Sequence, residues 1–215
     1  AWERGRDFAL GELRQNMAFR DFTFPEVQQA LGVTVSEADL FGGVHRAAVR
    51  EEFAAVIRDG TDLALAVNTE KARSEFIIAP LLLELRRSLK GGFGLFSGVE
   101  FNVDASRGLN GFCDFILTKS PRQIILSAPL VAIVEAKNDN LRTGFGQCIA
   151  AMVAAREYNL KSDAAIAVVY GAVTTGSAWK FLQLRQNDVI VDIHEYYIVD
   201  VAKIMGVLAS MVQGA

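Results

Sequence analysis

The sequence predicts an α/β protein with a central mixed β-sheet and helices on both faces. First, 215 residues fit a single domain with enough material for a substantial core. Second, short apolar runs with the two-residue period of strands alternate with longer segments at helical spacing. Third, the expected order is helix, strand, strand, strand, helix, strand, with hairpin-length connections among the first three strands and a helical crossover after the third. A crossover of this kind makes a sheet mixed and covers it with helices.

Composition narrows the expected location and partners. The net charge is −3, whereas a general nucleic-acid binder is usually basic. No apolar run approaches the ~20 residues that cross a bilayer, and the longest candidate, residues 198–212, carries Asp200 and Lys203. The first residues, Ala1 to Arg4, do not resemble a signal peptide. We therefore expect a soluble, cytoplasmic protein with no membrane partner.

Cysteine and histidine give no sign of a catalytic or structural metal site. Cys113 and Cys148 are too few for a disulfide framework or a zinc site, so we expect both to be buried as small hydrophobic residues. His45 and His194 lie far apart in the sequence, without further histidines near them.

Residues 1–67 are predicted to be a mainly helical N-terminal region. One helix is expected over residues 24–31, with Pro25 in its first turn and Gly32 after its end. A second is expected over residues 45–57, where apolar residues recur at helical spacing. The sequence does not decide whether this region covers the core, mediates dimerisation or positions a substrate.

A long helix should follow, from Thr69 to about Leu89. Thr69 can cap its N-terminus. Pro80 lies inside it and is expected to kink it, since proline removes one helical hydrogen bond and its ring clashes with a preceding carbonyl.

Glu75 is expected at the head of the apolar stripe of this helix, with Arg73 on or near the other side. A carboxylate on a core-facing stripe is costly unless it has a partner. Glu75 is therefore a site residue, a residue at the rim of the core, or the partner of Arg86 in an ion pair.

The remaining elements complete a core over residues 68–185 and a closing strand and C-terminal helix over residues 186–215. Strands are predicted over residues 97–103, 111–117, 131–137, 164–170, 179–184 and 189–193, with helices over 141–158 and 198–212. Residues 124–127 are a further candidate for a short pairing segment.

The strongest functional signal lies at the end of the apolar run that begins at Val131. Glu135 and Lys137 are two positions apart, so on a strand they project from the same face. The carboxyl end of a strand in an α/β sheet is a common place for ligands. Asp114 is an aspartate inside an otherwise apolar predicted strand, and Gln147 lies near the start of the following helix. Taken singly, each has an ordinary explanation as a solvated strand end or a capping residue.

Together these side chains favour a metal site. If Asp114 and Glu135 lie on neighbouring strands with their side chains on one face, two carboxylates meet, and each raises the pKa of the other unless a cation neutralises them. Mg²⁺ prefers hard oxygen ligands and is typically held by one or two carboxylates, water and substrate phosphate. Lys137 could then stabilise a developing anion or favour deprotonation of an attacking water.

The pattern resembles a known family at five positions: Glu75, Asp114, Glu135, Lys137 and Gln147. It is similar to the PD-(D/E)XK nuclease superfamily, which has the restriction-endonuclease-like fold with an αβββαβ core. Stand-alone bacterial members and the nuclease domain of type I restriction motor subunits are the most similar in pattern. The resemblance covers roughly residues 69–184. It departs from the motif name at Cys113, where the name has proline, a position that the family keeps loosely.

The resemblance implies a metal-dependent nuclease that hydrolyses phosphodiester bonds of DNA. Mg²⁺, or Mn²⁺ as a substitute, would be held by Asp114, Glu135, the carbonyl of Ala136 and Glu75. Lys137 would assist the attacking water or stabilise the transition state. Gln147 would orient Lys137 or contact phosphate.

Two questions about partners stay open in the sequence. The alternative to an enzyme is a module that keeps the fold and binds nucleic acid or protein without cleaving it. For DNA contacts we expect the loop residues Lys119, Arg122 and Arg142, which we place near the site. Because many nucleases of this fold cut both strands as dimers, the resemblance also implies a homodimer.

Overall fold

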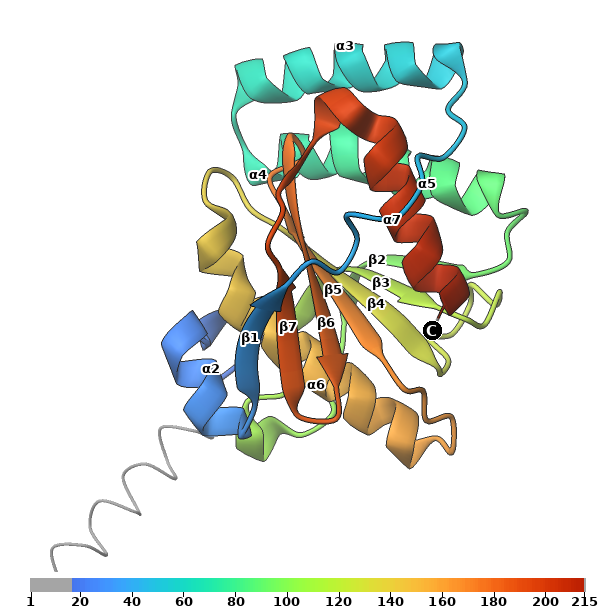
Figure 1. The fold of residues 1–215 in the computed structure, drawn as a ribbon. Coiled ribbons are helices and arrows are strands. Elements are labelled where there is room, and N and C mark those ends of the chain that lie inside the picture. Colours follow the sequence, from blue (N-terminus) through green and yellow to red (C-terminus); the bar gives the residue numbers. More distant parts are fainter. Residues whose placement is uncertain (1–16, 215) are drawn as a thin grey trace, which may run out of the picture.

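A single mixed β-sheet organises the chain, in a computed structural model that describes residues 17–214 (Figure 1). The strand order is β1-β7-β6-β5-β4-β3-β2, and β8 adds to β6. The pairs β1–β7 and β4–β5 are parallel, and the other pairs are antiparallel. The predicted fold class is therefore confirmed. The part of the predicted N-terminal region at residues 1–16 lies outside the described residues.

The elements have the following bounds. The strands are β1 Thr34–Ala38, β2 Gly94–Glu100, β3 Phe112–Thr118, β4 Leu130–Ala136, β5 Val169–Thr174, β6 Ala178–Arg185, β7 Asp188–Asp192 and β8 Tyr196–Tyr197. The α-helices are α2 Phe24–Leu31, α3 Glu51–Val67, α4 Glu70–Arg73, α5 Ala79–Ser88, α6 Phe145–Lys161 and α7 Val201–Gly214. Short 3-10 helices are η1 Phe19–Asp21, η3 Ala105–Arg107, η4 Leu141–Gly144 and η5 Ile198–Asp200, and a π-helical segment spans Ser74–Ile78.

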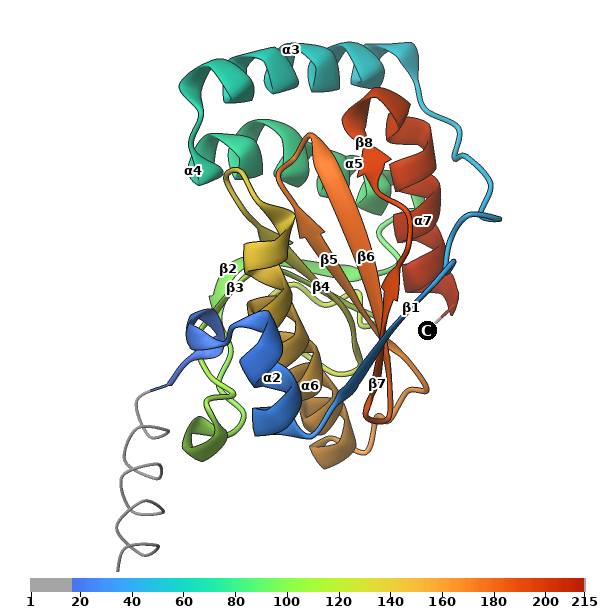
Figure 2. The same ribbon diagram turned by 60° about the vertical axis from the view of Figure 1, so that its left-hand side comes forward.

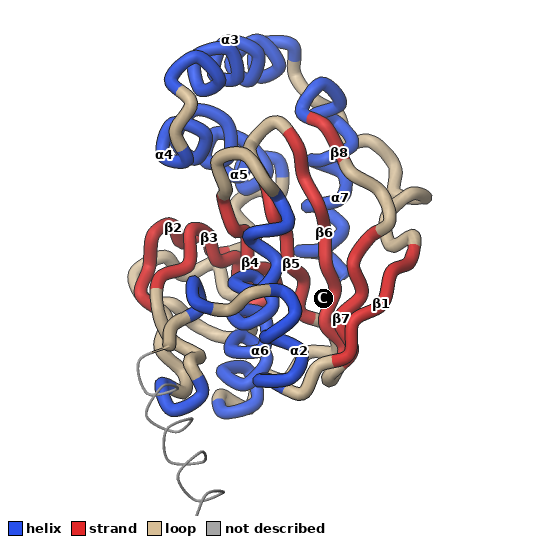
Figure 3. The backbone as a smooth tube through the Cα atoms, turned by 90° about the vertical axis from the view of Figure 1, so that its left-hand side faces the viewer, coloured by secondary structure: helices blue, strands red, loops and turns tan. Residues whose placement is uncertain are grey.

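Helices cover both faces of the sheet. Helices α5 and α7 pack on one face, and α3 packs on the outer side of α4 and α5 (Figure 2). Buried residues such as Phe53, Leu82 and Leu208 form one apolar cluster there. Helices α2 and α6 pack on the other, with Val27 and Ile149 in a second cluster. In Figure 3 the α2 and α6 layer lies in front of the strands and α7 lies behind them.

Helix α6 lies close to the sheet at Gly171 of β5, which has no side chain where the helix passes. A Cβ added at Gly171 of β5 would stand only 2.4 Å from the sulfur of Met152 on α6. Cys113 and Cys148 are buried free thiols, as predicted. Strand β4 is buried along its whole length, as expected for a strand with neighbours on both sides and helices on both faces.

The N-terminal region differs from the prediction in two ways. Residues 34–38 form the edge strand β1, whereas this region was predicted to be mainly helical. Helix α2 is confirmed, with Gly32 in the left-handed conformation after its end. The second helix spans residues 51–67 instead of 45–57. Residues 39–50 form a loop because Lys203 of α7 holds it, donating hydrogen bonds to three carbonyl groups of this segment.

The long helix after Thr69 is interrupted where Pro80 predicted a kink. Thr69 caps α4 through its hydroxyl, which accepts a hydrogen bond from the amide of Ala72. The π-helical segment then takes up the irregularity before Pro80, which has no N–H to offer to the carbonyl of Phe76. That carbonyl faces α3 at Gly60, where an added Cβ would lie 2.2 Å from its oxygen.

Further differences concern the sheet and its flanks. The strand predicted over residues 164–170 lies at 169–174, because residues 162–168 form a turn and an extended lead into the sheet. Residues 124–127 form no strand, and Ile124 is 96% exposed. Within residues 17–214, no helix is both long enough and apolar enough to cross a membrane.

Candidate active site at the carboxyl end of β4

The central pair of carboxylates comes from two adjacent antiparallel strands. Phe115 lies opposite Val134, and Ile116 lies opposite Ile133. Continuing this register by one pair places Asp114 opposite Glu135, on the face that carries α6. The sequence prediction that these two side chains meet on one face therefore agrees with the structure.

Hydrogen bonds fix the geometry of these groups. The backbone amide of Ala136 donates to Asp114 Oδ2 at 2.7 Å. Lys137 Nζ donates to Glu135 Oε1 at 2.6 Å and to Gln147 Oε1 at 3.3 Å. Asp114, Glu135, Lys137 and Gln147 are thus brought together, from β3, the end of β4 and the first turn of α6.

Glu135 is the most unusual group of the cluster. It is 1% exposed, and its Oε2 atom is buried without a hydrogen-bond partner among the described residues. Burial, followed by the nearby charge of Asp114, raises the pKa of Glu135 well above its usual range, although Lys137 acts in the opposite direction. A buried carboxylate oxygen with no donor is costly by itself. A bound cation would remove this cost.

Lys137 keeps its charge in this setting. Burial tends to lower its pKa, but the charge and hydrogen bond of Glu135 act against burial, with smaller contributions from Glu70 and Asp114. The net result is a pKa raised above the usual lysine value. Lys137 is therefore an ammonium group at neutral pH, held at the carboxyl end of β4.

The helical carboxylate at the site is Glu70, not Glu75. Glu75 points away from the cluster: its side chain is 52% exposed and pairs with Lys71 at 2.8 Å. Glu70 lies within electrostatic range of Lys137 and Asp114. Partial burial raises the pKa of Glu70, Lys137 lowers it and Asp114 raises it further. Five residues of α-helix correspond to a rotation of about 140°, so only one of the two glutamates can face the sheet.

Arg73, which was predicted on or near the outer side of the helix, is buried instead and connects three segments around the site. Its guanidinium donates to the carbonyl of Thr175 at 2.9 Å, to Asn138 Oδ1 at 3.2 Å and to Asn68 Oδ1 at 3.0 Å. Asn138 directly follows the site lysine, and Asp139 lies 4.0 Å from the guanidinium. We call Arg73 and these three acceptors the Arg73 clamp. The sequence signal for it was the i, i+3 spacing from Glu70, which puts both residues on one face of the helix.

The basic residues expected near the site lie at opposite ends of the central strands. Because β3 runs antiparallel to β4, the carboxyl end of β3 lies beside the start of β4, away from the site at the carboxyl end of β4. There the amide of Lys119 donates to the carbonyl of Pro129, just before β4 begins. The expectation that Lys119 and Arg122 lie near the site is therefore wrong. Arg142, in η4, is on the same side as the site.

A second group of potential ligands lies where β1 and β7 end. Ligand atoms of Asp39, Asp192 and His194 fall within 4.8 Å of one another. Both carboxylates already accept hydrogen bonds: Asp192 from the Tyr196 hydroxyl at 2.9 Å and from the amide of His194, and Asp39 from the amide of Gly42. These bonds explain the group as an anchor for the segments that follow the two strands.

The Asp114–Glu135 pair fits a divalent cation better than this second group does. Two carboxylates face each other there, one oxygen has no donor among residues 17–214, and Lys137 supplies only one positive charge. Hard oxygen ligands of this kind suit Mg²⁺ or Mn²⁺. Ala136, between the two strand-end side chains, gives its amide to Asp114, and Glu70 can complete the ligand set in place of Glu75.

Comparisons of the chain with protein-family models, with curated proteins and with solved structures found no match.

Proposed function

We propose that this chain is a metal-dependent nuclease of the PD-(D/E)XK type, which hydrolyses phosphodiester bonds of DNA. One observation carries the proposal. The buried Oε2 of Glu135 lies beside Asp114 and has no hydrogen-bond partner in the described part of the chain, while Lys137 is hydrogen-bonded to the other oxygen of the same carboxylate. A buried acid pair with an adjacent lysine is expensive as a structural feature and useful as a site for a cation and a phosphate.

Asp114 and Glu135 would hold Mg²⁺ or Mn²⁺, aided by the carbonyl of Ala136 and by Glu70. The bound cation supplies a Lewis acid that polarises the phosphoryl oxygen and lowers the pKa of a water molecule. The order of elements from α4 to β5 is the αβββαβ order that the resemblance implies. This agreement of topology supports the proposal alongside the site.

Lys137 would act as an electrostatic stabiliser. Burial opposes its charge, but the charge and hydrogen bond of Glu135 raise its pKa, so Lys137 is an ammonium group in this structure. Its positive charge is available to the phosphate oxygens as negative charge develops on them. Gln147 accepts a hydrogen bond from Nζ and so fixes the direction of the side chain.

Cleavage assays with matched variants test the proposal. Purified protein would be incubated with plasmid and with single-stranded DNA, in Mg²⁺, in Mn²⁺ and in chelator. We expect cleavage that requires metal, falls by about 100-fold or more in Asp114→Ala and Lys137→Ala, and is unchanged in Glu75→Gln. Glu70→Gln should reduce it, because Glu70 interacts electrostatically with Lys137 and Asp114.

Two results would overturn the proposal. Equal cleavage by the wild type and both site variants would identify a contaminating nuclease. No cleavage of any nucleic acid with either metal would favour a non-catalytic binding module that keeps this fold.

A further inference from the structure

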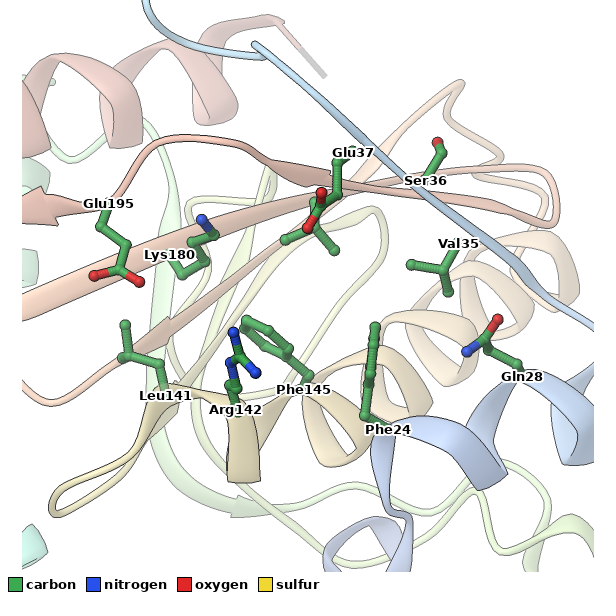
Figure 4. A pocket seen from close by; sticks show the side chains of 11 residues that line it. Phe24, Gln28, Val35, Ser36, Glu37, Leu141, Arg142, Phe145, Lys180 and Glu195 are labelled. Carbon is green, nitrogen blue, oxygen red and sulfur yellow. The ribbon is translucent and has the colours of Figure 1, made fainter.

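A cavity of about 610 Å³ lies beside the candidate active site, between helix α2 and the start of α6 on one side and strands β1, β6 and β7 on the other (Figure 4). Its walls combine two phenyl rings with polar and charged groups. Figure 4 shows the rings of Phe24 and Phe145 and the guanidinium of Arg142 directed into the space beneath the strands.

The cavity and the candidate active site share one wall. At the end of η4, Gly144 lies against Lys137, where an added Cβ would be 3.1 Å from the lysine Cγ. Arg142, two residues earlier in η4, lines the cavity. The first turn of α6 is divided in the same way: Phe145 lines the cavity, and Gln147 accepts a hydrogen bond from Lys137. A chain bound at Lys137 therefore passes next to the cavity.

The apolar part of the wall suits a planar ring. Phe24 and Phe145 meet edge to face, with ring centroids 5.5 Å apart, and both are only partly buried by the protein. Partly exposed phenyl rings in a cavity are typical surfaces on which an unstacked nucleobase packs. Gln28, on the same wall, has an amide that can both donate and accept, as the edge of a base requires.

The charged residues of the wall favour a base inside the cavity and a phosphate at its rim. Glu37 and Glu195 line the cavity and oppose a polyanion inside it, but they can accept hydrogen bonds from exocyclic amino groups. The guanidinium of Arg142 is exposed at the rim and has no hydrogen bond or ion pair with any residue in 17–214, although the backbone amide of Arg142 donates to Asn140. Lys180, by contrast, already donates to the carbonyl of Ile193. Arg142 is therefore the cation available for a phosphate.

We propose that this cavity binds one unstacked nucleobase of the strand whose phosphodiester lies at Lys137, with Arg142 on a flanking phosphate. This inference rests on the proposed nuclease function and extends it, because it assigns a subsite for a base next to the site of cleavage. The preferred substrate is then single-stranded, or a duplex from which one base is extruded.

A binding measurement in the Asp114→Asn background tests the inference while the strand stays intact. The probes are short fluorescent single-stranded oligonucleotides in Mg²⁺, one intact and a series with a single abasic position moved along the strand. At one position, loss of the base should weaken binding by roughly 5- to 100-fold. Adding Phe145→Ala should weaken binding of the intact strand similarly and remove the effect of the abasic position. Phe145→Leu, which keeps apolar volume without a ring, guards against a folding defect.

Charge variants give a second, independent readout. Arg142→Gln should weaken binding of every strand and reduce the slope of log affinity against log salt by about one. Arg122→Gln removes one positive charge at the opposite end of the central strands and should change neither the affinity nor the salt slope. Arg142→Gln with the same affinity and salt slope as Arg122→Gln would overturn the role of Arg142.

The outcomes distinguish this inference from the proposed function. If the wild type cleaves DNA but no abasic position matters, or if the effect survives Phe145→Ala, the base subsite is refuted and the nuclease proposal stands. If the wild type neither cleaves nor binds any strand, the proposed function fails and this inference fails with it.

Discussion

Replacement of Arg73 by methionine tests whether the Arg73 clamp holds the candidate active site together. The side chain is 7% exposed, and its guanidinium makes three hydrogen bonds to acceptors in three different segments. Asn68 is exposed and Asn138 is half-buried, so water can replace the arginine at both. The carbonyl of Thr175 is in a buried residue and would lose its charged donor.

The expected loss of stability follows from these contacts. A hydrogen bond to a charged group contributes about 1.5–3 kcal/mol, and the two partly exposed bonds contribute less. We therefore expect Arg73→Met to lower the free energy of unfolding by about 2–4 kcal/mol, which for a chain of this size is roughly 5–15 °C in Tm. The free energy of unfolding of Arg73→Lys should fall between those of the wild type and Arg73→Met, because an ammonium group cannot reach all three acceptors in the planar geometry of a guanidinium.

The assay is urea unfolding of the wild type and both variants, followed by cleavage kinetics at a temperature where all are folded. Because Asn138 follows Lys137, Arg73→Met should also lower kcat by more than it raises KM. A free energy of unfolding of Arg73→Met within about 0.5 kcal/mol of the wild type is the range of an ordinary surface substitution. It would show that the Arg73 clamp does not stabilise the fold.

Three further predictions concern other parts of the chain. Gly60→Ala should cost about 1–3 kcal/mol by thermal unfolding, despite the better helix propensity of alanine, because the new Cβ would lie 2.2 Å from the carbonyl oxygen of Phe76; a stabilised variant would contradict this. Hydrogen bonds from Arg87 lower the pKa of Glu84, although burial opposes them, so its contribution to stability is present above its usual pKa and is lost as pH falls through the lowered value. Glu84→Gln should therefore lower Tm at pH 7 and approach the wild type in acid; a difference that does not depend on pH would argue against this. Lys119→Gln should leave cleavage and DNA affinity unchanged in the assays above, because Lys119 lies beside the start of β4 and the site lies at its carboxyl end. A clear loss would contradict that placement.

The acid pair and its lysine were predictable because they depend on short-range rules. Two-residue strand periodicity put Glu135 and Lys137 on one face, and a hairpin-length connection made Asp114 a neighbour. The sequence alone left Asp114 and Glu135 without an exact register, which the pairing of β3 with β4 supplies.

The choice between Glu70 and Glu75 needed information that periodicity does not contain. The π-helical segment between Arg73 and Pro80 changes the phase of the helix, so that a stripe counted from Glu75 does not continue regularly. Strand β1 was missed for a different reason: four of its five residues are exposed, so it lacks the apolar alternation by which strands are found.

The wrong placement of Lys119 and Arg122 was avoidable. In an antiparallel pair, the connection joins the carboxyl end of the first strand to the start of the second strand. The carboxyl end of the second strand therefore lies a full strand length away from the connection. The loop after β3 therefore cannot lie beside Lys137, which follows β4. This rule, applied to the predicted order of strands, would have left Arg142 as the loop cation on the side of the site.

Titration calorimetry with Mn²⁺ measures whether Asp114 and Glu135 bind a divalent cation. We expect a site whose affinity falls by at least about 100-fold in Asp114→Asn and in Glu135→Gln, and is kept in Glu75→Gln and in Asp39→Asn. Affinity unchanged in Asp114→Asn, or lost only in Asp39→Asn, would place the ion elsewhere in the molecule and contradict a metal site at the Asp114–Glu135 pair.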